Sequence, residues 1–109
     1  MGFVERKYCL IYTNFKTANL AQALIDKLFE RKMIFCAQLQ SSMTSIYFWK
    51  GQRCQESEIP VFFKTRMDFK ENVMSLIESE HSYDCPFIGV LELQDINQKY
   101  RQWADQQLS

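Results

Sequence analysis

The chain has 109 residues, of which 47% are hydrophobic, 24% charged and 15% aromatic. This length suits one domain that buries its own core, so we expect a single domain over residues 1–109. Thirteen basic residues balance thirteen acidic ones, and a neutral chain has no overall field to attract nucleic acid or an anionic membrane.

The compartment is predicted from short apolar runs and scattered cysteines. The longest purely apolar runs, residues 8–12 and 33–37, are far shorter than the roughly 20 residues that span a membrane. Residues 1–6 lack the apolar core of a signal peptide. No two of the four cysteines form a C-x-x-C pair. We therefore expect a cytoplasmic protein with reduced thiols, and a secreted two-disulfide framework is the second interpretation.

A strand and a helix are predicted first. Residues 7–14 combine β-branched and aromatic side chains without a helical period, which is typical of a strand. Leu20, Leu24 and Leu28 then recur at helical spacing within residues 17–32, and Thr17 is among the candidates for the N-terminal cap.

A long hairpin is predicted next. Residues 35–50 and 54–65 read as strands joined by a short turn that contains Gly51. Pro60 lacks a backbone donor, which predicts a bulge or a point where strand pairing changes partner. The alternative is a shorter hairpin in which Pro60 precedes the paired part.

The last elements complete an α+β pattern. Asp68 and Glu71 have the spacing of a capping box and predict a helix that ends near His81. Residues 86–93 then read as a strand, and Asn97 is predicted to cap a short terminal helix. The order β-α-β-β-α-β-α predicts a ferredoxin-like βαββαβ sandwich with a C-terminal helix, in which two helices cover one face of an antiparallel sheet.

The hairpin also predicts self-association. A strand with one solvent-exposed face should alternate apolar and polar residues, but residues 46–49 and 61–63 are apolar throughout. Because the two helices cover only one face, the other would expose large aromatic side chains that monomers rarely leave in water. We therefore expect a homo-oligomer.

A family resemblance covers nearly the whole chain. It is carried by the motifs K-M-I-F-C-A at 32–37, T-S-I-Y-F-W-K-G at 44–51, K-T at 64–65 and H-S-Y-D-C-P at 81–86, followed by Asn97, Tyr100 and Trp103. In this order and spacing they resemble the CutA divalent-cation tolerance family. The resemblance implies a cytoplasmic homotrimer, similar in fold to PII signalling proteins, in which hairpins of neighbouring subunits pair. It also implies a response to metal ions and copper binding.

Metal ligands follow from the same resemblance. Cys36 and His81 stand in the family's cysteine and His-x-Tyr positions, and Cys85 is an additional candidate. Thiolate and imidazole suit copper or zinc better than magnesium or calcium. The alternative is that Cys36 is a small buried hydrophobe and that His81 interacts with the end of a helix. Weak copper binding is favoured over a preformed site, and no cofactor is required.

A cleft between subunits is the other candidate site. Trp49 and Tyr83 would form its walls and Lys64 would orient an anionic ligand. The alternative is that these side chains pack within an interface. The chain has one His and three Gly and lacks nucleophile and phosphate-loop motifs, so we expect no enzyme.

Parts of the sequence also suggest two other functions. The first is a PII-like regulatory trimer that binds a small ligand in its clefts and signals to a protein partner. The second is RNA binding through aromatic side chains on the strands. The neutral net charge excludes it, and so does the lack of the basic, glycine-containing RNP motif in residues 54–65.

Overall fold

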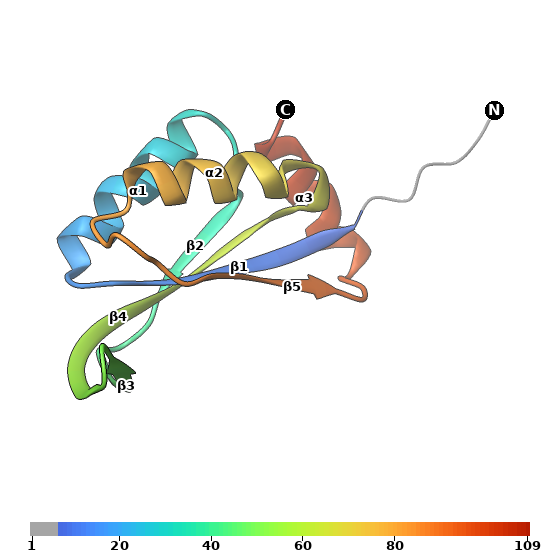
Figure 1. Cartoon of the computed structure of the whole chain (residues 1–109). Coiled ribbons are helices and arrows are strands. Elements are labelled where there is room, and N and C mark those ends of the chain that lie inside the picture. The colour runs from blue at the N-terminus through green and yellow to red at the C-terminus, as the bar shows by residue number, and fades with distance from the viewer. Residues whose placement is uncertain (1–6) are drawn as a thin grey trace.

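The computed structural model describes residues 7–109 and has two layers, with helices above a sheet (Figure 1). The strands are β1 (Tyr8–Phe15), β2 (Cys36–Leu39), β3 (Met43–Trp49), β4 (Gln52–Arg66) and β5 (Ile88–Leu93). The helices are α1 (Ala18–Glu30), α2 (Lys70–Glu80) and α3 (Gln98–Gln107), with a 3₁₀ turn, η1 (Met67–Phe69), before α2. The expectation about a signal peptide concerns residues 1–6, which lie outside the described residues.

The sheet is antiparallel in the order β2-β4-β1-β5, and β3 pairs with the first half of β4. This confirms the predicted ferredoxin-like α+β fold with a C-terminal helix. No helix within residues 7–109 combines the length and the apolar character needed to cross a membrane.

Helix α1 begins and ends where its sequence indicates. Thr17 is the N-cap, and its Oγ1 accepts a hydrogen bond from the Leu20 backbone N–H at 3.2 Å. The buried residues of α1 lie at helical spacing, from Ala21 to Leu28. The helix ends at Glu30, just before Lys32 takes a left-handed backbone conformation with φ 54°.

The predicted capping box of α2 is wrong. Phe69 occupies the N-cap position without a side-chain cap, and the Asp68 carboxylate binds Arg66 instead, at 2.9 Å from Nε and 3.1 Å from Nη2. A guanidinium presents two parallel donors to a carboxylate, which is a stronger interaction than one neutral backbone N–H offers. Asn97 does hold the N-cap position of α3, although its side chain makes no cap hydrogen bond.

The main core lies between the sheet and helices α1 and α2. Alternate residues of β1, among them Cys9 and Ile11, point into it together with Val61 and Phe63 of β4. Burying one such large side chain stabilises the fold by about 1.5 to 3 kcal/mol. This core holds the sheet rigidly and leaves the β3–β4 hairpin as the part that projects from it (Figure 1).

The predicted strand 35–50 is divided into β2 and β3, and the division is linked to Pro60. Strand β2 pairs with residues 61–64 of β4 and β3 pairs with residues 52–58, while the Gln40 N–H donates to the Pro60 carbonyl at 2.9 Å. The predicted change of pairing partner at Pro60 is therefore confirmed. The hairpin closes through Lys50 (φ 52°) and Gly51 (φ 76°), a two-residue turn with both residues left-handed.

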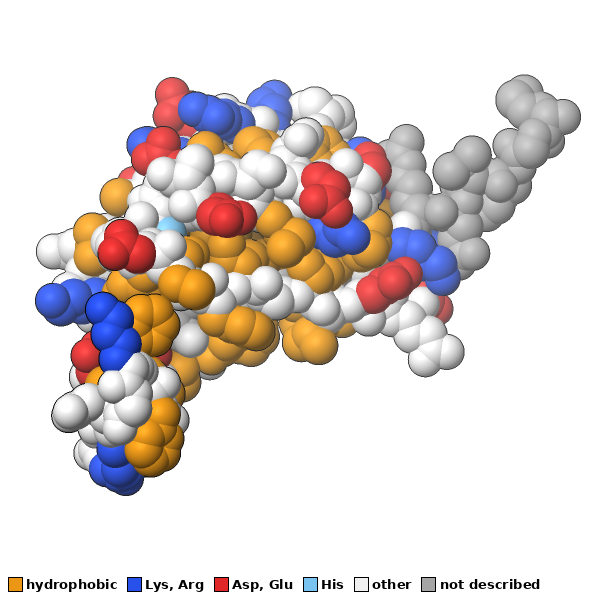
Figure 2. Space-filling view, viewed as in Figure 1, with side chains coloured by type: hydrophobic (Ala, Val, Ile, Leu, Met, Phe, Trp, Pro, Cys, Tyr) orange, Lys and Arg blue, Asp and Glu red, His pale blue; other side chains and the backbone are white. Residues whose placement is uncertain are grey.

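Within residues 7–109, the second face of the sheet is covered at one end only. There α3 packs Ala104 and Leu108 against Tyr8 and Phe35. Beyond α3, the same face carries a group that we call the open face: Leu10, Tyr12, Phe62, Phe87 and Leu91. The Tyr12 ring lies 4.9 Å from Phe62 and 5.8 Å from Phe87 between centroids. Figure 2 shows hydrophobic side chains along this side of the sheet.

Candidate functional site

One face of the β3–β4 hairpin gathers polar and aromatic side chains. Strand pairing places Tyr47 opposite Cys54, Ser45 opposite Glu56 and Met43 opposite Glu58. Directly paired residues share a face, and alternate positions along each strand return to it. Trp49 therefore joins Tyr47 on this face, which we call the inner face of the hairpin.

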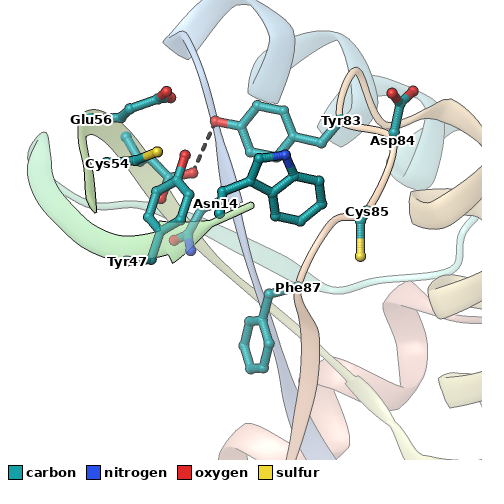
Figure 3. A pocket seen from close by; sticks show the side chains of 10 residues that line it. Asn14, Tyr47, Cys54, Glu56, Tyr83, Asp84, Cys85 and Phe87 are labelled. Carbon is teal, nitrogen blue, oxygen red and sulfur yellow. Dashed lines mark hydrogen bonds between the residues drawn. The ribbon is translucent and has the colours of Figure 1, made fainter. Parts of the chain in front are cut away.

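The inner face looks onto the segment that connects α2 to β5, and the two enclose a pocket of about 530 Å³ (Figure 3). The hydroxyl of Tyr83 donates to Glu58 Oε2 at 2.9 Å and so ties the segment to the hairpin. The pocket is lined by Asn14, Tyr47, Trp49, Cys54, Glu56, Glu58, Tyr83, Asp84, Cys85 and Phe87. This volume is in the range of sites for small molecules.

The pocket is acidic. Glu56, Glu58 and Asp84 are among its lining residues, which include no Lys or Arg within the described part of the chain. Burial and the hydrogen bond to Glu58 raise the pKa of Tyr83 well above its usual range. The pKa of Tyr47 is also raised, by desolvation and then by the charge of Glu56. Both hydroxyls therefore stay protonated and can donate.

His81 positions the connecting segment. Its ring stacks on Phe15 with centroids 4.7 Å apart and planes 6° apart. Its Nε2 donates to the Asn14 carbonyl at 2.8 Å, and its Nδ1 accepts the Tyr83 backbone N–H at 3.1 Å. These partners require the neutral ring with the proton on Nε2. Burial, the main cause, lowers the pKa of His81.

The three candidate metal ligands do not meet within one chain. Cys36 pairs with Lys64 and is thereby level with Leu10 of β1, whereas His81 contacts Asn14, four residues or about 13 Å farther along that strand. Both ring nitrogens of His81 are already engaged. Within residues 7–109, no three His, Cys, Asp or Glu side chains are grouped as a metal site would require. A single site built from Cys36, His81 and Cys85 of one chain therefore does not fit.

The candidate cleft residues are brought together in part. Trp49 and Tyr83 line the same pocket, and so does Cys85. Lys64 lies elsewhere, with Nζ 5.6 Å from the ring centroid of Tyr100 on α3. Within one chain it therefore cannot orient a ligand that touches Trp49.

Sequence reasoning missed several lining residues. The turn at Gly51 fixes which hairpin residues face each other, and alternate residues of a strand share a face. From these two rules one could have predicted four of the lining residues: Tyr47, Cys54, Glu56 and Glu58. No sequence pattern predicts Asn14 as a lining residue, because it is the tertiary fold that brings the end of β1 beneath the hairpin.

Comparisons with known proteins agree with this architecture. Residues 9–107 match the family model described as CutA1 divalent ion tolerance protein. A protein of Pyrococcus horikoshii named "Divalent-cation tolerance protein CutA" is 30% identical over 94 residues, which cover 86% of this chain and 91% of that protein. A Yersinia pestis protein of the same name is 31% identical over 88 residues, or 81% of this chain and 74% of that protein.

Solved structures lead to the same family. The crystal structure of divalent ion tolerance protein CutA1 from Ehrlichia chaffeensis superposes with a TM-score of 0.92, at 28% identity, and covers 97% of this chain and 99% of that one. CutA1 from Pyrococcus horikoshii gives a TM-score of 0.87 at 29% identity, over 93% of this chain and 98% of that one. With the family model and these relatives in agreement, the chain belongs to the CutA1 divalent ion tolerance protein family.

Proposed function

We propose that this chain is the subunit of a non-catalytic, cytoplasmic homotrimer that takes part in the response to divalent metal ions. The observation that carries the proposal is the open face, where Phe87 is 62% and Leu91 56% exposed in the single chain. Covering each such side chain with another copy gains about 1.5 to 3 kcal/mol. The hairpin adds Phe48, which is 74% exposed on the face opposite the pocket.

The test of assembly uses a charge placed in the open face. Leu91→Glu should shift the protein from trimer towards monomer in analytical ultracentrifugation, because a carboxylate is costly to bury without a partner. Leu20→Glu is the matched control, since Leu20 is a similarly exposed leucine on α1, away from the open face. The proposal fails if Leu91→Glu assembles as the native chain does, or if the control dissociates equally.

For the metal we propose weak copper binding through the thiols, without a preformed three-ligand site. Cys85 is exposed and Cys36 is half-buried, and both are free cysteines. Thiolates favour Cu(I). Free thiols also support the cytoplasmic assignment.

Cys85→Ser and Cys36→Ser should each lower the copper bound per chain at equilibrium, whereas His81→Gln should leave it unchanged. Unaltered copper binding in both serine variants would remove these residues from the account.

A second function, the binding of a small ligand in the manner of a PII-like regulator, is favoured by one observation. Trp49 and Tyr83, both expected in a cleft, line the same pocket of small-molecule size. Saturable binding of a small molecule that depends on Trp49 would support this function, and it requires no metal.

A further inference from the structure

The charge of the pocket restricts what it can bind. Glu56, Glu58 and Asp84 line it, and the lining residues within the described chain include no Lys or Arg to balance them. Glu58 accepts a hydrogen bond from the Tyr83 hydroxyl across the pocket, and the Tyr47 side chain is hydrogen-bonded to Glu56. An anionic ligand would be repelled here, whereas a cation would find uncompensated carboxylates.

Aromatic side chains form the walls. Tyr47 and Trp49 come from the hairpin and Tyr83 from the connecting segment, and Figure 3 shows Tyr47 and Tyr83 on these two sides of the pocket. The face of an aromatic ring carries negative electrostatic potential and attracts ammonium groups, most strongly for Trp.

An uncommitted acceptor lies at the base. Asn14 lines the pocket, and its Oδ1 is buried without a hydrogen-bond partner among residues 7–109. Buried polar atoms in folded proteins nearly always have a partner. A rotation of this amide would present an acceptor to an N–H or to a polarised C–H of a bound molecule.

The size of the pocket also indicates an organic ligand. A volume of about 530 Å³ is far larger than a bare metal ion needs. No three metal-ligating side chains of the described chain are grouped there. We propose that the pocket binds a small organic cation, one that carries an alkylated ammonium group against the aromatic walls. This inference rests on the second proposed function, ligand binding at the hairpin, and names the class of ligand.

The test compares a cation with its neutral equivalent. In a Trp103→Phe background, which leaves Trp49 as the sole tryptophan, titration with choline chloride should change the fluorescence saturably. The uncharged analogue 3,3-dimethylbutan-1-ol has the same shape without the charge, and it should bind at least about tenfold more weakly. Glu56→Gln should weaken choline binding by about tenfold, because it removes one negative charge that attracts the ammonium group.

Glu92→Gln on β5 is the matched control, because Glu92 is an exposed carboxylate outside the pocket. It should leave choline binding unchanged. Equal loss in both Gln variants would overturn the inference by showing attraction to general surface charge. Equal affinity for choline and its neutral analogue would overturn the cation assignment but leave ligand binding standing. Absence of binding by both molecules at millimolar concentration would overturn both.

Discussion

His81 joins three parts of the chain at the scale of single residues. It stacks on Phe15, donates to the Asn14 carbonyl and accepts the Tyr83 N–H, so one side chain fixes the end of α2, the end of β1 and the wall of the pocket. The sequence placed it at the end of a helix and as a candidate ligand. Its partners could not be predicted, since they depend on how β1 passes beneath α2.

This environment predicts a pH dependence of stability. Because burial lowers the pKa of folded His81 below the ordinary value of 6.5, the unfolded chain binds the proton more readily. The contribution to the free energy of unfolding is therefore constant above about pH 6.5 and decreases as the pH falls below it. Between about pH 7.5 and 5.5, denaturant unfolding should show a larger loss for the native chain than for His81→Gln. Equal losses would contradict the buried neutral ring.

The turn residues Lys50 and Gly51 have opposite effects on stability. Both are left-handed, which costs a lysine roughly 1 kcal/mol and glycine almost nothing. Lys50→Asn should raise the free energy of unfolding by about 0.5 to 1 kcal/mol, because Asn tolerates this conformation. Gly51→Ala should lower it by about 1 kcal/mol, although the added Cβ would meet no atom within 4 Å. Denaturant titration measures both, and a neutral Gly51→Ala would refute the backbone explanation.

At the scale of elements, periodicity predicted the helices and the strands β1, β4 and β5, but it predicted one strand where the structure has β2 and β3. The leucine spacing of α1 and the cap at Thr17 are local signals, and both are confirmed. The division of residues 35–50 was not predicted, because it arises where β4 exchanges β3 for β2 at Pro60. The capping box at Asp68 was predicted wrongly for a similar reason, which is a contact that the local pattern does not include. The Asp68 carboxylate binds the Arg66 guanidinium instead of the backbone of α2.

Helix α3 is attached by a polar network that also tests the fold. The Tyr8 hydroxyl donates to Asp105 Oδ1 at 2.8 Å, and Arg66 Nη1 donates to the same oxygen at 3.3 Å. Burial and the bond to Asp105 raise the pKa of Tyr8 to about 12. Asp105→Ala leaves these donors without this acceptor, which should cost about 1 to 2 kcal/mol.

The Asp105→Ala change should also speed amide hydrogen exchange in α3 more than in α1, because the hydrogen bonds that it removes attach α3 to the sheet. Gln106→Ala, an exposed neighbour on the same helix, is the control and should alter neither quantity. Uniform exchange across the chain would show that α3 is held by its apolar contacts alone.

At the scale of the whole molecule, the apolar character of the two central strands has two different explanations. Val61 and Phe63 point into the core, while Phe62 points to the open face. In the hairpin, Tyr47 and Trp49 line the pocket, and Phe48 is on the outer face. The sequence predicted that both faces need cover. It could not predict that the inner face of the hairpin forms a pocket with its own chain.

The central claim is that identical copies cover the open face, and the mass of the native protein in solution tests it most directly. Sedimentation equilibrium at micromolar concentration should give the mass of three 13.0 kDa chains. A well-folded species with the mass of one chain would contradict the claim, because Phe87 and Leu91 would then remain in water with no partner to cover them.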